Sequence, residues 1–187
     1  MRIACCMLVS MYAIASGAAP AKAAGVPQAT VACDATVFVN DDDPAGLNVR
    51  SGPGSGNAVV AKLREATWAH VIGSNGMWMR IDRATIDDGE GGEGRAEFSG
   101  DGWVYGPLLG VEGAGGEDGR GTVVRAGPAA DARIVGLIAP DDGEATLQGC
   151  KGEWLELEHH SYANPGAAVR GWARAGDTCT NPNTVCN

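Results

Sequence analysis

The sequence has few basic residues, and it has no long apolar run beyond its first 24 residues. It contains 14 Lys and Arg against 23 Asp and Glu, so its formal net charge is −9. An acidic surface repels nucleic-acid phosphates and anionic lipid, and we therefore expect no nucleic-acid partner. A helix that crosses a bilayer needs about 20 apolar residues, and no later segment provides them. We predict no stable membrane span.

The sequence also lacks the residue patterns of a catalytic or metal centre. No Cys-x-x-Cys pair occurs, and the histidines are limited to His70, His159 and His160. A cysteine–histidine hydrolase needs a free thiolate beside a histidine, whereas the cysteines are better explained as disulfides. His159 and His160 are adjacent and would point to opposite faces of a strand, and three consecutive aspartates at 41–43 do not supply the six or more oxygen donors of a calcium site. We expect these five residues to be solvated loop residues, and we predict no enzyme, no metal and no cofactor.

The first 24 residues have the features of a secretory signal peptide. Arg2 gives a positive start, residues 3–15 are apolar or small, and Ala21-Lys22-Ala23 has the small-x-small pattern of a cleavage site. The apolar run is too short to cross a bilayer. We predict a signal peptide over residues 1–24 and an exported protein of the periplasm or extracellular space.

Four cysteines follow this segment, and they are the candidates for disulfides: Cys33, Cys150, Cys179 and Cys186. An even number of cysteines behind a signal peptide favours two disulfides in an oxidising compartment. Cys179 and Cys186 enclose a short segment whose Asn-Pro turn can bring them together, which leaves Cys33 with Cys150. In the alternative, Cys150 bonds to one tail cysteine and Cys33 to the other, and the sequence does not choose between the two.

The chain carries the same landmarks twice, in the same order. Val-Arg-Ser-Gly-Pro at 49–53 returns as Val-Arg-Ala-Gly-Pro at 124–128. The further matches are Val59-Val60 with Ile134-Val135, Leu63 with Ile138, residues 76–81 with 152–157, and Gly102-Trp103-Val104 with Gly171-Trp172-Ala173. A repeat of this size indicates a duplicated structural module.

Short strands separated by turn residues are predicted along the whole chain, because no stretch has a sustained helical period. The predicted strands are 31–39, 46–50, 58–64, 68–73, 77–82 and 102–105, and then 122–125, 132–138, 144–148, 154–158 and 170–174. Within 78–81, Met79 and Ile81 are expected to share the core face. Residues 84–101 and 110–121 are acidic or rich in glycine, so they are expected to be mobile loops. This pattern favours a small sandwich or barrel.

The first copy resembles the bacterial SH3-like (SH3b) domain. Its Leu47-Asn48-Val49-Arg50-Ser51-Gly52-Pro53-Gly54 run, its strand at 59–63, its Gly-x-Trp at 76–78 and its Gly-Trp at 102–103 all match the landmarks of that family. The second copy keeps Val-Arg-x-Gly-Pro at 124–128 but lacks the preceding Leu-Asn. The resemblance implies an all-β chain with two tandem small SH3-like open β-barrels, each of about five or six antiparallel strands.

The repeat and the resemblance together predict the organisation of the chain. A signal peptide covers 1–24, a first domain covers 34–109 with a loop insertion at 84–101, and a linker covers 110–121. A second, diverged domain covers 122–176, and a cysteine-containing tail covers 177–187.

The resemblance implies a non-catalytic binding module. Family members lie in exported or envelope proteins, bind cell-wall or other peptides, and are often attached to a peptidoglycan hydrolase. Two modules occupy most of this chain, so no hydrolase domain is expected. The predicted ligand is peptidoglycan or another peptide. A structural module that docks on another envelope protein is the alternative, and an accessory of a cell-wall hydrolase is a third interpretation.

Exposed aromatic rings are the predicted ligand contacts, since rigid rings in a shallow groove suit an extended peptide. Trp68 and Tyr105 lie outside the strict repeat and are the first candidates, followed by Trp78 and Trp103. The tryptophans at the repeated positions are also expected to close the small cores: Trp78, Trp103, Trp154 and Trp172. Arg50 and Arg125 recur at one position and are expected to pack over an aromatic ring or to pair with an acidic neighbour.

Overall fold

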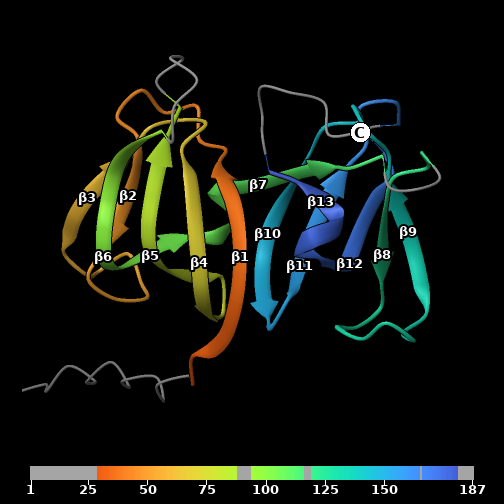
Figure 1. Cartoon of the computed structure of the whole chain (residues 1–187), viewed down its shortest axis with the longest axis horizontal. Coiled ribbons are helices and arrows are strands. Elements are labelled where there is room, and N and C mark those ends of the chain that lie inside the picture. The colour runs from red at the N-terminus through yellow and green to blue at the C-terminus, as the bar shows by residue number, and fades with distance from the viewer. Residues whose placement is uncertain (1–28, 88–93, 116–118, 165, 181–187) are drawn as a thin grey trace, which may run out of the picture.

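The computed structural model describes residues 29–87, 94–115, 119–164 and 166–180, which form strands joined by short turns (Figure 1). The strands are β1 (Val31–Val39), β2 (Leu47–Arg50), β3 (Val59–Leu63), β4 (Trp68–Asn75), β5 (Trp78–Ile86), β6 (Arg95–Tyr105), β7 (Leu109–Gly113), β8 (Thr122–Arg125), β9 (Ile134–Ile138), β10 (Glu144–Lys151), β11 (Trp154–His160), β12 (Ala168–Arg174) and β13 (Thr178–Cys179). Single 3-10 turns, η1 (Gly106–Leu108) and η2 (Ala175–Asp177), follow β6 and β12. The all-β prediction is confirmed. The predicted signal peptide and Cys186 lie outside the described residues.

Within those ranges, none of the helical segments has the length and apolar character needed to span a membrane.

Every strand predicted from the sequence is present, but two predicted loops are wrong in part. β5 continues to Ile86 and β6 begins at Arg95, so both ends of the 84–101 segment belong to a hairpin. The 110–121 segment begins inside β7, most of whose residues are buried. β1 and β8 begin and end where the sequence predicts them.

Glu97 explains why part of the predicted 84–101 loop is ordered. Its carboxylate accepts hydrogen bonds from the Thr67 hydroxyl at 2.7 Å, from the Arg64 backbone N–H at 3.2 Å and from Arg64 Nε at 2.6 Å. Partial burial alone would raise the pKa of Glu97, but these donors outweigh burial and lower the pKa below its ordinary value. The charged carboxylate therefore anchors the start of β6 to the turn between β3 and β4.

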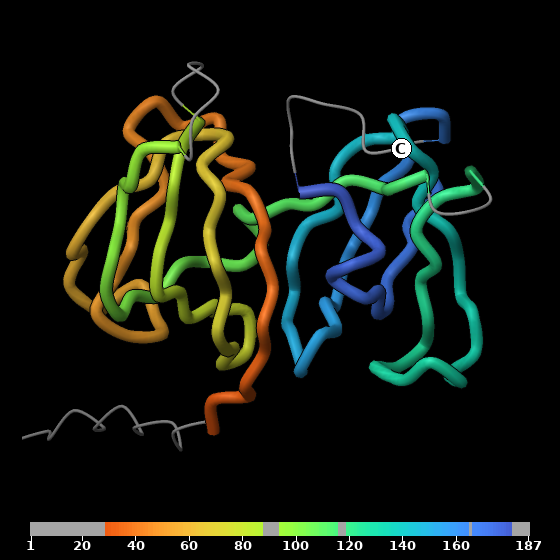
Figure 2. Tube along the Cα trace, viewed as in Figure 1, coloured from red at the N-terminus to blue at the C-terminus, as the bar shows by residue number. Residues whose placement is uncertain are grey.

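The strands form one continuous hydrogen-bonded path, in the order β3-β2-β6-β5-β4-β1-β7-β10-β11-β12-β8-β9, with β13 on β7. Figure 1 shows β1–β6 as one group, which we call the first half, and β8–β13 as another, the second half. The chain passes from one to the other through β7 (Figure 2). β7 pairs with β1 through Leu109 and Gly110 and with β10 through Gly110, Val111 and Glu112. The sheet path is therefore shared between the halves and does not close on itself.

The strand pairings of the first half recur in the second half. Arg50 of β2 pairs with Trp103 of β6, and Arg125 of β8 pairs with Trp172 of β12. Trp78 pairs with Tyr105, and Trp154 pairs with Arg174. The two 3-10 turns are held alike, because the N–H of Gly106 donates to the Met77 carbonyl and that of Ala175 to the Glu153 carbonyl, each at 2.8 Å. The repeat in the sequence thus corresponds to a repeat in strand pairing.

Buried apolar side chains from both halves form one hydrophobic cluster. The largest completely buried members are Leu63, Met79, Ile81, Leu109, Ile138, Leu147, Leu155 and Leu157. Met79 and Ile81 share the core face of β5, as their alternation with Trp78 and Arg80 predicts.

A disulfide between Cys33 of β1 and Cys150 of β10 links the two halves. This bond is the Cys33–Cys150 part of the first pairing left open by the sequence, and the alternative, in which both cysteines bond to the tail, is wrong. Backbone hydrogen bonds from Asp34 N–H to the Gly152 carbonyl and from Gly152 N–H to the Ala32 carbonyl lie beside it, at 3.0 and 2.9 Å. Cys179 is also disulfide-bonded.

Gly106 of η1 packs tightly against the backbone of β10. A Cβ at this position would lie 2.6 Å from the Leu147 carbonyl oxygen and 2.8 Å from Met79 Cε. We expect Gly106→Ala to lower the free energy of unfolding by about 1–3 kcal/mol, because backbone and core must move apart. Urea unfolding followed by circular dichroism measures this change.

Gly176→Ala is the matched control, since nothing lies within 4 Å of a Cβ built there. Equal unfolding midpoints for the two variants would show that η1 and β10 can accommodate a methyl group at Gly106 without a loss of stability.

Candidate functional site

A groove of about 650 Å³ opens on the first half, and we call it the first groove. The residues that define it are Asp41, Asp43, Asn48, Arg50, Trp78 and Tyr105. They come from the loop after β1, from β2, and from the adjoining ends of β5 and β6. The pairing of β2 with β6 and of β6 with β5 brings these segments together.

Trp78 and Tyr105 form an aromatic pair in this groove. They are direct cross-strand partners, their ring centroids lie 5.5 Å apart, and their planes are tilted by 54°. Their neighbours Met79 and Val104 are buried, so alternation directs both rings away from the core. The Tyr105 hydroxyl donates to Met77 Sδ at 3.8 Å. The pair offers apolar ring surface beside polar groups, a combination suited to binding.

Asp41 and Asp43 also line the first groove, from the loop that follows β1. Asp41 Oδ1 accepts the N–H of Asp43 at 3.1 Å, and Asp43 Oδ1 accepts the N–H of Ala45 at 2.8 Å. Each carboxylate uses one oxygen to hold the turn and keeps a second one. As predicted, residues 41–43 lie in a loop rather than in a strand.

Arg50 closes the turn that follows β2. Its Nη1 donates to the Asn57 carbonyl at 2.8 Å, and Arg125 Nη1 donates to the Ala132 carbonyl of the second half at 3.0 Å. The recurring arginine therefore holds a backbone turn in each half. The sequence had predicted contact with an aromatic ring or an acidic residue and did not predict this hydrogen bond to a backbone carbonyl. Arg50 also lines the first groove.

An ion pair lies on the same outward strand face as the aromatic pair. Arg80 and Asp101 meet through two contacts of 2.6 and 2.8 Å. Hydrogen bonding from Arg80 lowers the pKa of Asp101 below its ordinary value, and the same bond raises the pKa of Arg80. In the second half the pair has its charges exchanged, with Glu156 and Arg170 at 3.3 Å.

The other two candidate tryptophans lie outside the first groove. Trp103 is 8% exposed, but it lies opposite Arg80 on the outward face of the strands and is not part of the hydrophobic cluster. Trp68 lines a separate pocket of about 390 Å³ with His70 and Arg83. Its indole N–H is buried without a hydrogen-bond partner among the residues that the structure describes.

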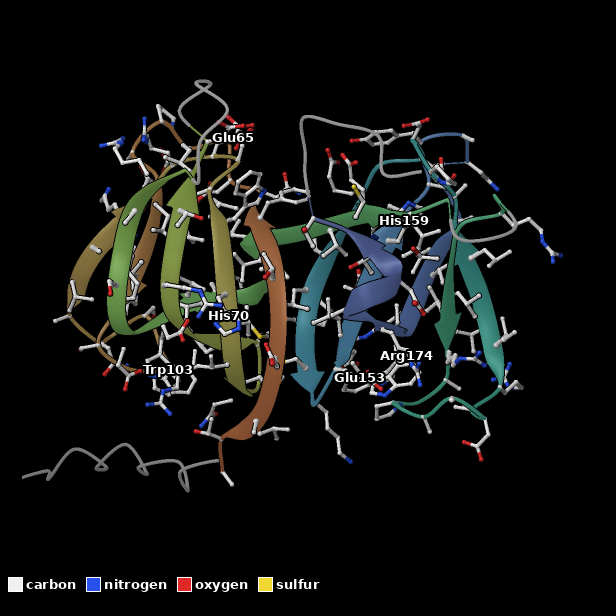
Figure 3. All side chains as sticks on the ribbon, viewed as in Figure 1. Glu65, His70, Trp103, Glu153, His159 and Arg174 are labelled. Atoms are coloured by element: carbon white, nitrogen blue, oxygen red, sulfur yellow. A yellow bond between two sulfur atoms is a disulfide. The ribbon has the colours of Figure 1, made fainter. Side chains whose placement is uncertain are left out.

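The counterpart of the aromatic pair in the second half is covered. Trp154 is 8% exposed, and Arg174, at the position of Tyr105, places its guanidinium carbon 5.3 Å from the Trp154 ring centroid. Arg174 Nη2 also lies 3.6 Å from Glu153 Oε1, and Figure 3 shows both side chains at the same end of the second half. The partly exposed pair of rings in the first half therefore has a covered counterpart in the second half.

The histidines occupy three different environments (Figure 3 labels His70 and His159). Both ring nitrogens of His70 lie near carboxylates, with Asp34 at 2.9 Å and Asp82 at 2.7 Å. The expectation of a solvated loop is wrong for His159, which is 1% exposed and bonded through Nε2 to the Asp142 carbonyl at 2.9 Å. β11 extends to His160, so alternation turns His159 inward and leaves His160 exposed.

Residues 43–94 match the family model of the bacterial SH3 domain. The match begins at Asp43 of the first groove and includes Arg50 and Trp78. The comparisons with curated proteins and with solved structures gave no match.

Proposed function

We propose that the chain is an exported binding module whose first groove holds an extended peptide of the cell wall, because residues 43–94 match the bacterial SH3 domain. The bacterial SH3 domain is in general a non-catalytic binding module. One observation carries the proposal for this chain: Trp78 and Tyr105 present paired rings in a groove that is open to solvent. Such rings hold an extended chain at low entropic cost.

Export is supported by the covalent chemistry of the chain. The Cys33–Cys150 disulfide is of a kind that persists in oxidising compartments. We propose the periplasm or the extracellular space as the location. Within the chain, residues 34–109 and 122–176 are the proposed domains, and the second is a diverged copy of the first.

Co-sedimentation with purified peptidoglycan tests the function. We expect the oxidised mature protein to pellet with insoluble peptidoglycan and to be released by an excess of soluble stem peptide. Titration of the same peptide should change the tryptophan fluorescence, because Trp78 lines the groove. Protein that stays in the supernatant and shows no fluorescence change would rule out the cell-wall ligand.

Docking on another envelope protein is the second candidate function. The disulfide and the strand path through β7 favour it, since they hold the halves in one orientation as a rigid spacer would require. Crosslinking in intact cells separates the two functions: one defined protein adduct supports docking, and recovery with the wall fraction supports peptide binding.

A further inference from the structure

A second groove, of about 450 Å³, lies where the two halves meet, and we call it the junction groove. The first half contributes Val31 and Met77 to its lining, and the second half contributes Lys151, Arg170 and Trp172. Cys150 of the interhalf disulfide also lines it. The walls therefore come from both halves and are tied covalently beside the groove.

Trp172 is more exposed than its counterpart in the first half. Trp103 and Trp172 occupy the same register position, opposite Arg50 and Arg125. Trp103 is 8% exposed, whereas Trp172 is only partly buried. A partly exposed tryptophan in the wall of a groove is a typical anchor for a ligand.

Apolar surface connects the junction groove to the first groove. Met77, which is 46% exposed, lines the junction groove, and its sulfur accepts the Tyr105 hydroxyl of the first groove. Trp78, the next residue in the chain, lines the first groove. One extended chain can therefore contact the aromatic pair and then Met77.

The two grooves differ in charge. Asp41 and Asp43 line the first groove together with Arg50, while Lys151 and Arg170 line the junction groove with Glu156. Arg170 is paired with two carboxylates, Glu156 at 3.3 Å and Glu158 at 3.7 Å, whereas Lys151 is exposed. The ammonium group of Lys151 therefore favours a negatively charged ligand group at this end of the junction groove.

We propose that the junction groove is a second subsite for the peptide held by the first groove. It takes an apolar side chain against Met77 and Trp172 and a carboxylate of the peptide at Lys151. This inference rests on the proposed function, because it needs a peptide in the first groove. It assigns a binding role to the diverged second half, whose own aromatic site is covered by Arg174.

Two substitutions at exposed positions test the subsite: Lys151→Glu and Met77→Ser. The probe is a soluble cell-wall stem peptide with a free C-terminal carboxylate, compared with the same peptide as its C-terminal amide, and fluorescence or calorimetric titration gives the Kd. We expect Lys151→Glu to weaken binding of the free acid about tenfold and binding of the amide less than threefold. Met77→Ser should weaken binding of both peptides about threefold to tenfold.

Matched controls separate the subsite from general effects of charge and polarity. Arg133→Glu reverses an exposed charge, and Val59→Ser removes an apolar side chain that is 47% exposed; neither residue lines the first groove or the junction groove. If Lys151→Glu and Met77→Ser bind like these controls while Tyr105→Ala loses binding, the second subsite is wrong and the proposed function stands. If the unsubstituted protein binds neither peptide, both proposals fail.

Discussion

Replacing Cys33 and Cys150 together by alanine is expected to lower the free energy of unfolding by about 2–5 kcal/mol. The disulfide joins residues separated by 117 positions, so its loss frees a large loop in the unfolded chain. Polar native contacts remain beside the disulfide site after the substitution. They include the Ser74 hydroxyl to the Cys150 carbonyl at 3.2 Å and the backbone pair at Gly152. Urea unfolding of both proteins under oxidising conditions measures the difference.

Substitution is a cleaner test than reduction, because Cys179 is also disulfide-bonded and a reductant would open both links. Ser74→Ala is the matched control, since it removes a hydrogen bond at the same junction without opening the covalent link. We expect this control to cost about 1 kcal/mol. A double cysteine variant as stable as the unsubstituted protein would mean that the strand path through β7 and the shared hydrophobic cluster hold the halves together without the covalent link.

The strands were largely predictable from the sequence because their signals are local. β1 and β8 are rich in valine or threonine, which favour strands, and turn residues follow both of them. The residue preferences and the turn signals therefore predict the same strand boundaries. β7 was missed because it carries two glycines in five residues and its partners β1 and β10 are distant in sequence. Such a strand is stabilised by pairing with distant strands and by burial. Neither can be predicted from the local sequence pattern.

The candidate site was predictable only in part, because exposure depends on what covers each ring. Trp78 and Trp154 occupy one repeated position, yet the first faces Tyr105 and the second lies beneath Arg174. The signal was present in the sequence, since extending the alignment of Gly102-Trp103-Val104 with Gly171-Trp172-Ala173 by one residue aligns Arg174 with Tyr105. Each groove is lined by segments that are far apart in the chain. No local sequence pattern predicts that these segments meet, and only the folded structure brings them together.

Trp78→Ala and Tyr105→Ala are each expected to weaken peptide binding at least about 30-fold, a loss of about 2 kcal/mol or more. Both rings lie on the outward face of β5 and β6, so their removal deletes ligand contact area and spares the buried Met79 and Val104. Loss of either ring also removes the tilted aromatic pair that orients the other. Calorimetric titration with the stem peptide, at matched Tm and circular dichroism, measures the effect.

The second half supplies the control for this prediction, because Arg174 is the structural counterpart of Tyr105. Arg174→Ala deletes a side chain of comparable size that stacks on Trp154, and we expect less than a twofold change in the Kd of the peptide. Equal losses from Tyr105→Ala and Arg174→Ala would place ligand contacts in both halves and contradict the assignment of the aromatic site to the first half alone. A loss confined to Tyr105→Ala and Trp78→Ala would instead support a division in which the first half supplies the aromatic site and the second half contributes through the junction groove.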